Sequence, residues 1–355
     1  MRNIGSKILR ACLLTFALLF FTGKASAISF ALDSIATWGK FPRFCVNTYR
    51  WGDKFFNTYD TTYVKPTGFK FNVKLTSESW IDYYRFDFEP ERHMEMVSDI
   101  ASNVGVHLTY MAVSVGYDMN INKFFNGYEK TRKRLNFAFN CALFGADIYM
   151  HNNDLTTTIT SFGNRQESYR PDIKFDGASI DRWGFDVYYF LNNKKYSQAA
   201  SFYYGRVQNK SQGSWYFGLS FCNQRYTFDF NQLPDGILQY FPEEWDDYTY
   251  RVKTKTYSLK AGYAYNWVLG KNWIIAVSES PMIGLRTGHV NSYNKRSVAL
   301  NNSLRISAIY NHRNKRVFAG IVGNVNTGLI TDPETTMIAN NFTAEISIGY
   351  RFNLW

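Results

Sequence analysis

Period-two alternation of apolar and polar residues dominates the chain from Gly68 to its end. In the closing stretch, residues 342–352, every second side chain is apolar, and those between are polar or glycine. The same pattern recurs in eight earlier segments: 69–75, 104–110, 113–119, 135–141, 183–189, 215–221, 259–267 and 304–310. Since strand side chains alternate between two faces, each segment predicts a strand with one apolar face.

Alternation alone fits both a soluble β-sandwich and a membrane barrel. Aromatic residues make up 18% of the chain and crowd the apolar faces. Several segments are about ten residues long, enough to cross a bilayer when tilted, whereas sandwich strands are usually shorter. After the first residues, no stretch reaches 18 consecutive apolar residues, so a transmembrane helix is not expected. We therefore predict an all-β fold, a transmembrane antiparallel β-barrel.

Connection lengths give a strand count. Residues 269–272 and 311–316 predict short turns, while 224–252, 286–298 and 326–340 predict long links on the other side. Short periplasmic turns and long outer loops are typical of outer-membrane barrels. Residues 197–207 break this order unless they fold into the lumen or pad a turn. Read in that way, the chain predicts about 12 strands, within a range of 10–14, and a partly plugged lumen.

The N-terminal residues predict export. Residues 1–27 combine basic residues, an apolar run and the small residues "ASA", as a cleaved signal peptide does; a membrane anchor is the alternative. Residues 28–60 predict a periplasmic leader, in which aromatic and basic residues fall near helical spacing, and residues 61–355 the barrel. The leader helix is expected to lie against the membrane, to close one barrel mouth or simply to pack.

Charge and cysteine content exclude other classes. Removing residues 1–27, which hold four basic residues, leaves 36 basic and 29 acidic residues, a net charge of +7. The only dense basic run is "KTRKR" at 130–134, so a nucleic-acid partner is not expected. The three remaining cysteines, Cys45, Cys141 and Cys222, do not predict a disulfide framework.

Candidate chemistry is sparse. The chain has five histidines, of which only His107 falls on the polar face of a predicted strand. It would be the first base to test in a lipid or peptide hydrolase, although no nucleophile can be named and neither a G-x-S-x-G nor an H-E-x-x-H motif occurs. The acidic stretch "PEEWDDY" at 242–248 could bind calcium, contact a glycan or be solvated. No cofactor and no metal site are predicted.

The polar faces define a set of charged lumen candidates. In a narrow barrel these residues would pair across the lumen, and in a wider one they would line a solute path. They are Lys70, Lys74, His107, Asp118, Asp186, Lys260, Arg305, Glu345 and Arg351.

Several stretches resemble one family. They are residues 59–75 ("YDTTYVKPTGFKFNVKL"), 83–88, 190–221, 257–285 and the terminal "IGYRF". The chain resembles the domain of unknown function 4421 family of Gram-negative bacteria over most of residues 55–354. The resemblance implies an outer-membrane barrel and supplies no catalytic residues. The ending "YRF" is similar to the aromatic signal that the barrel-assembly machinery reads, although three residues follow it.

Three functions remain open from the sequence. The first is an integral outer-membrane barrel, structural or a restricted solute channel, with outer-membrane lipid and the barrel-assembly machinery as partners. The second is a membrane-embedded hydrolase. The third is a soluble exported β-sandwich that binds a sugar or a lipid.

Overall fold

The structure is a computed structural model of the whole chain. It describes residues 37, 39–40, 43–44, 47, 51–52, 54–55, 58–88, 92–110, 113–121, 132–164, 168–170, 172–233, 249–290, 293–331 and 335–353. The predicted signal peptide and the acidic stretch 242–248 lie outside these residues. Within them, no helix is both long enough and apolar enough to cross a membrane.

The elements are almost all strands. They are β1 (Val64–Pro66), β2 (Phe71–Phe88), β3 (Arg92–Ser98), β4 (Ala101–Tyr110), β5 (Val113–Asn120), β6 (Arg132–Asn140), β7 (Phe144–Asn164), β8 (Ser168–Tyr169), β9 (Ile173–Phe190), α5 (Gln198–Ser201), β10 (Arg206–Gln208), β11 (Gln212–Asp229), the 3-10 helix η1 (Phe230–Gln232), β12 (Thr249–Leu269), β13 (Trp273–Val290), β14 (Tyr293–Asn311), β15 (Val317–Thr331) and β16 (Thr335–Phe352).

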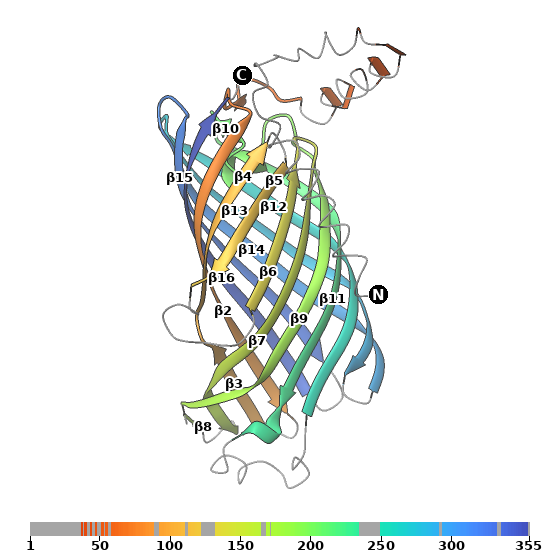
Figure 1. Ribbon diagram of the computed structural model, residues 1–355. Helices are drawn as coiled ribbons and strands as arrows, with labels where there is room; N and C mark the ends of the chain where they lie inside the picture. Colours follow the sequence, from red (N-terminus) through yellow and green to blue (C-terminus); the bar gives the residue numbers. More distant parts are fainter. Residues whose placement is uncertain are drawn as a thin grey trace. The chain divides into compact units, whose positions relative to one another are not determined.

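The main sheet closes on itself (Figure 1). β2 pairs antiparallel with β16 along its whole length, from Phe71↔Phe352 to Phe88↔Thr335. Closure leaves no free edge between the first and last long strands, as a bilayer requires. The closed antiparallel barrel confirms the fold prediction, and the closing stretch 342–352 is part of the last strand. We call the end at Phe71 and Phe352 the terminal end, and the opposite one the distal end.

The barrel wall forks along its length. Near the distal end, β3 joins β2 directly to β7. Toward the terminal end, β4, β5 and β6 stand between β2 and β7 instead. Among the described residues the wall therefore has twelve strands at the terminal end and ten at the distal end. The twelve agree with the predicted count.

At the distal end the outward face of the wall becomes polar and the inward face becomes apolar. On β12, the outward side chains from Tyr257 to Trp267 are mostly apolar and exposed, while Ser258 and Lys260 point inward. A tilted strand of about 9–11 residues crosses a bilayer, and this outward row fits that span. Beyond it Arg251 and its outward neighbours are charged, and Tyr250 is fully buried inside.

This exchange explains where the predicted long links were wrong. The links expected at 286–298 and 326–340 are mostly strand, because β13 to β16 continue beyond the apolar belt. Their outward polar residues look like loop residues in sequence. The third link, 224–252, is shorter than predicted, since β11 extends to Asp229 and β12 begins at Thr249. The short turns at 269–272 and 311–316 are confirmed.

The lumen is filled at the distal end by a distal core. Nine of its nineteen described buried side chains are aromatic, and the cluster includes Phe86, Met94, Phe175, Phe228 and Tyr250. Phe86 contacts both Phe228 and Tyr250 edge to face, with ring centroids 4.9 and 5.5 Å apart. Such packing matches the interior of a soluble barrel.

Residues 191–211, the plug segment, fold into the lumen at the terminal end. All four residues of α5 are buried, and Ala200, Phe202 and Tyr204 pack on inward side chains of β13, β14 and β15. Ser197 caps α5 by accepting a hydrogen bond from the Ala200 amide. The segment does not span the wall, in agreement with the reading that 197–207 fold inward.

The chain divides into two compact units, residues 1–54 with 354–355 and residues 55–353. The described residues between 40 and 55 are helical. Phe44 and Trp51 are 66% and 63% exposed. A membrane-facing role for this helix stays a prediction.

Candidate functional site in the lumen

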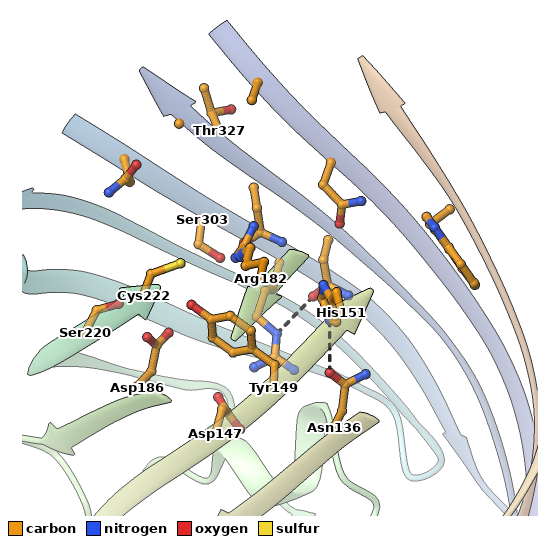
Figure 2. A pocket seen from close by; sticks show the side chains of 18 of the residues that line it. Asn136, Asp147, Tyr149, His151, Arg182, Asp186, Ser220, Cys222, Ser303 and Thr327 are labelled. Atoms are coloured by element: carbon orange, nitrogen blue, oxygen red, sulfur yellow. Dashed lines mark hydrogen bonds between the residues drawn. The ribbon is translucent and has the colours of Figure 1, made fainter. Parts of the chain in front are cut away.

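A polar cavity of about 330 Å³ lies in the lumen between the plug segment and the distal core (Figure 2). Phe202 and Tyr203 of the plug segment line one side, and Tyr84, Ile180 and Tyr226 line the side toward the distal core. The walls between them carry charged and amide side chains from many strands. A concave site with a few convergent polar groups is the usual form of a ligand pocket.

Asp147 on β7 connects the wall to the plug segment. Its two carboxylate oxygens accept hydrogen bonds from Tyr188 and Tyr203, both at 2.9 Å. Burial raises the pKa of the Tyr203 hydroxyl, so this group stays a donor. Arg305 Nη1 donates to the Tyr203 oxygen at 3.3 Å, and its guanidinium lies 4.6 Å from the Phe202 ring centroid. The plug is thus held by charge-assisted contacts.

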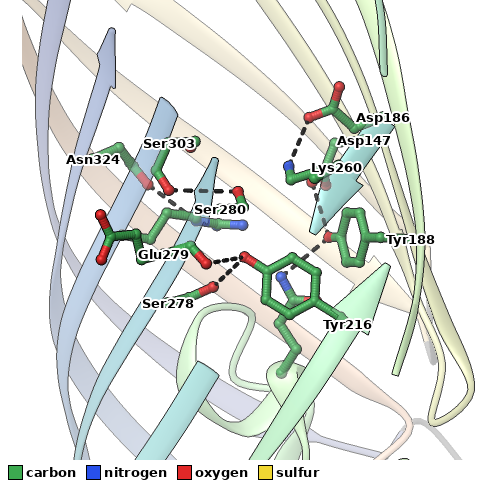
Figure 3. Close-up of polar contacts among 12 residues, drawn as sticks. Asp147, Asp186, Tyr188, Tyr216, Lys260, Ser278, Glu279, Ser280, Ser303 and Asn324 are labelled. Atoms are coloured by element: carbon green, nitrogen blue, oxygen red, sulfur yellow. Dashed lines mark hydrogen bonds and ion pairs between the residues drawn. The ribbon is translucent and has the colours of Figure 1, made fainter. Parts of the chain in front are cut away.

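Lys260 and Asp186 form a lumen ion pair with Nζ and Oδ2 3.0 Å apart (Figure 3). Both side chains are at least four-fifths buried, and Lys260 Nζ also lies 5.3 Å from the Tyr188 ring centroid. A buried pair of this kind contributes little net stability, but loss of one partner is costly.

Arg182 on β9 projects into the cavity beside Tyr149 (Figure 2). Its guanidinium carbon lies 4.9 Å from the Tyr149 ring centroid. Its Nε atom is buried and has no hydrogen-bond partner, and no ion pair among the described residues includes it. A planar cation held in this way is suited to bind a carboxylate or a phosphate.

Two further pairs line the wall near β2. Lys74 Nζ lies 2.8 Å from Glu345 Oε1, and His107 Nε2 lies 3.0 Å from Asp118 Oδ1. His107 and Asp118 lie flat over Gly116 and Gly105, where an added Cβ would meet them at 1.9 and 1.8 Å. These glycines make room for the pair.

Arg351 is the most deeply buried charge of the candidate set, at 1% exposure. It lies beside the plug rather than in the open cavity, with its guanidinium carbon 4.4 Å from the Phe318 ring centroid. Lys70 does not line this cavity. It precedes β2 by one residue and is exposed, and its backbone amide donates to Asn353 at 2.8 Å.

The structure therefore gathers Lys74, Asp186, Lys260, Arg305 and Glu345 around the cavity. His107 and Asp118 pair with each other, and Arg351 holds the plug.

Asp147 and Arg182 are the functional candidates that sequence reasoning missed. Arg182 directly precedes the predicted segment 183–189 and has the parity of its polar residues, whereas Asp147 lies on β7, for which the sequence predicts no alternating segment. In sequence, β7 (Phe144–Asn164) alternates less clearly than the eight earlier segments that predict strands. Extending the segment 183–189 back by one residue at the same parity predicts Arg182 as an inward residue, but no predicted segment extends back to Asp147.

Among the described residues, neither His107 nor His93 forms part of a catalytic triad. The described side-chain bonds of His107 reach Asp118 and no nucleophile. His93 Nε2 lies 3.2 Å from Ser161 Oγ, but Asp87, which pairs opposite His93, binds Arg85 instead. A triad needs a carboxylate that orients the histidine. Among the described residues, no group of three His, Cys, Asp or Glu side chains could hold a metal.

Comparison with known proteins places the chain in context. A family model described as "Domain of unknown function (DUF4421)" matches residues 58–352. The chain matches no curated protein.

Several solved structures are similar to the chain. The outer membrane protease OmpT from Escherichia coli has a TM-score of 0.37 at 8% identity, covering 79% of this chain and 96% of OmpT. The toluene transporter TodX of P. putida has a TM-score of 0.29 at 8% identity, covering 84% and 96%. The outer membrane protein OprG from Pseudomonas aeruginosa has a TM-score of 0.26 at 10% identity, covering 83% and 100%. These similarities concern the fold alone.

Proposed function

This chain belongs to the DUF4421 family, and we propose that it is an outer-membrane barrel with a closed lumen that binds a small polar ligand. The protein would reach the outer membrane through the predicted signal peptide and the barrel-assembly machinery. It would then be anchored in lipid by the apolar outward belt.

One observation carries the proposal: the cavity lies between two packed layers. A solute that moved along the barrel axis would have to cross the distal core on one side and the plug segment on the other. Packed interiors leave few voids larger than a water molecule. This arrangement favours binding over free passage and disfavours an open porin.

The lining supports a ligand of mixed or negative charge. Lys260 and Arg305 already contact carboxylate or phenol oxygens, while Arg182 keeps a donor without a partner. A ligand with an acidic group would complete the hydrogen bonds of Arg182, whose unmet donor is otherwise costly.

Planar-bilayer conductance tests the closed lumen. The purified wild-type barrel is expected to give no steady single-channel steps. A variant in which residues 194–209 are replaced by a short Gly-Ser linker is also expected to stay closed, because the distal core blocks the axis independently. Heat-dependent mobility on a detergent gel verifies that each preparation is a folded barrel. Steady conductance from the folded wild type would overturn the proposal.

A further inference from the structure

A group of exposed cations lies on the outward face of four neighbouring strands. β11, β12, β13 and β14 follow one another in the wall. Beyond their outward apolar rows, toward the distal end, several outward positions carry basic side chains. All of these side chains are exposed. We call four of them the basic patch: Arg225 on β11, Lys253 and Lys255 on β12, and Arg296 on β14.

The strand register places these cations side by side. Arg225 lies directly opposite Lys253. Lys255 and Arg296 both lie opposite Thr287 of β13, one on each side of it. Neighbouring strands are roughly 4.8 Å apart, so the flexible basic side chains can meet at one anionic group. Like charges directly opposite each other destabilise a strand pair, and a bound anion would remove that repulsion.

The described wall does not neutralise the basic patch. No ion pair among the described residues includes any of its four cations. Asp181 on β9 lies opposite Arg225, but its carboxylate accepts a hydrogen bond from Asn152 instead. The basic patch therefore keeps its donors for a group from outside the chain.

β2 and β3 show the opposite arrangement at the same end of the barrel. Arg85 forms ion pairs with Asp87 at 3.0 Å and with Glu95 at 3.4 Å. Charges on that part of the wall balance one another, as on an ordinary solvated face. The basic patch differs because cations gather there without such acidic partners.

The basic patch borders directly on the apolar belt. The next outward side chains toward the terminal end are Tyr257 on β12, Leu285 on β13 and Val298 on β14, which are 54%, 66% and 60% exposed. An outward face that changes from cationic to apolar matches an amphiphile with an anionic headgroup and acyl chains. Clusters of Lys and Arg at a membrane boundary attract such headgroups.

From this juxtaposition we infer that the basic patch binds the phosphate groups of a lipid in the outer leaflet, whose acyl chains lie along the apolar rows of β12 to β14. Arg225 and Arg296 supply forked donors that suit phosphate oxygens, and the two lysines supply positive charge between them. The short turns at 269–272 and 311–316 lie at the terminal end. Since short turns are periplasmic in outer-membrane barrels, the distal end is expected to face outward.

This inference goes beyond the proposed function, because the site lies on the outer surface of the wall and needs no ligand in the lumen. It commits to a phosphorylated amphiphile rather than to free phosphate or an acidic protein. The headgroup and the acyl chains must then both contribute to binding.

Native mass spectrometry of the purified protein in detergent tests the inference. The probe is lipid A with two phosphates, and the comparison lipid is the same molecule with both phosphates removed. Heat-dependent mobility on a detergent gel verifies that each preparation is folded. The test variant replaces the basic patch with glutamine: Arg225→Gln, Lys253→Gln, Lys255→Gln and Arg296→Gln. The matched control removes four exposed positive charges near the terminal end: Lys70→Gln, Lys194→Gln, Lys271→Gln and Arg313→Gln.

The test variant is expected to bind lipid A at least ~10-fold more weakly than the wild type, because loss of even one hydrogen bond between charged groups costs about that factor. The control variant should bind it as the wild type does. Lys253→Arg combined with Lys255→Arg, which keeps the charge, should retain binding. The wild type should bind the dephosphorylated lipid at least ~10-fold more weakly, and this comparison requires no variant to fold.

Equal binding of the two lipids by the wild type would overturn the inference. Equal weakening by the test and control variants would also overturn it, because the effect would then follow net charge rather than the basic patch. A third contrary result is displacement of lipid A by inorganic phosphate at equal concentration, since the acyl chains would then contribute nothing.

Discussion

Arg351 donates two hydrogen bonds to the backbone carbonyl of Tyr204, from Nε at 3.1 Å and from Nη2 at 2.8 Å. Its Nη1 also donates to the carbonyl of Lys315 at 2.7 Å. Tyr204 and Lys315 both have left-handed backbone, with φ of 60° and 59°. One buried cation of the last strand therefore holds the plug and a terminal turn, each through a residue in a conformation that costs energy.

Arg351→Ala is expected to lower the free energy of unfolding by about 3–5 kcal/mol, because it leaves buried carbonyls without donors. Arg351→Lys should cost less but still destabilise, since one ammonium cannot reach all the acceptors. Urea unfolding in detergent, followed by tryptophan fluorescence, measures the change. Exposed Arg316→Ala is the control. A loss no larger than that of the control would show that Arg351 does not hold the plug.

Lys315→Gly is expected to stabilise the barrel by about 0.5–1 kcal/mol. A non-glycine residue in the left-handed region pays roughly 1–2 kcal/mol, which exceeds the extra entropy that glycine loses on folding. The Lys315 carbonyl remains available to Arg351. The control is Lys271→Gly, in the other terminal turn, where Gly270 already takes the left-handed position. If both substitutions change the free energy of unfolding equally, the left-handed backbone of Lys315 does not destabilise the barrel.

The wall within the membrane could be predicted from the sequence because its side chains alternate between an apolar outward face and a polar inward face. Most strands of the belt alternate, as the closing row with Phe342 and Ile346 shows. The distal end could not be predicted from the same pattern. There the strands extend beyond the apolar belt, so their outward side chains are polar and their inward side chains are apolar. On β11, Trp215 and Phe217 face outward, while Phe228 is fully buried inside. The apolar residues shift from one parity to the other along a single strand, and in sequence this shift resembles the start of a loop.

The candidate site was predictable only as a set of inward charges. Parity identified Lys260 and Asp186 as inward residues, but their pairing depends on the register between β9, β11 and β12. The contact of Tyr203 with Asp147 joins residues 56 positions apart through a segment that has no regular pattern. Such partners follow from how the plug folds back, which alternation does not encode.

Gly116→Ala is expected to destabilise the barrel by about 1–3 kcal/mol, the usual cost of overpacking. The new Cβ would overlap the His107 ring, 1.9 Å from Nδ1, and would displace it from Asp118. Gly205→Ala is the matched control, because its nearest neighbour is the Ala199 Cβ at an ordinary 3.8 Å. Urea unfolding of both variants checks the difference. Equal stability of the two would mean that the wall relaxes around His107 without cost.

Glu279 is an exposed carboxylate in the outward row of β13, between lipid-facing neighbours such as Ile275 and Ile283. Asn302 on β14 donates to its Oε1 at 3.3 Å, also on the exposed face. A carboxylate at this depth in a barrel wall is unfavourable, though less so than Arg or Lys. One hydrogen bond from an amide offsets only part of that cost.

Glu279→Leu is therefore expected to raise the stability of the barrel in lipid vesicles by about 1–2 kcal/mol, because it replaces a lipid-facing charge with an apolar side chain. The same substitution at Glu345 should have the opposite sign. Glu345 points inward and pairs with Lys74 at 2.8 Å, so Glu345→Leu leaves a lumen cation unpaired and costs about 3 kcal/mol. Reversible urea unfolding in vesicles measures both variants against wild type. If Glu279 faced water instead of lipid, Glu279→Leu would give no gain in stability. Opposite signs of the two stability changes would therefore show that the outward face of the wall contacts lipid.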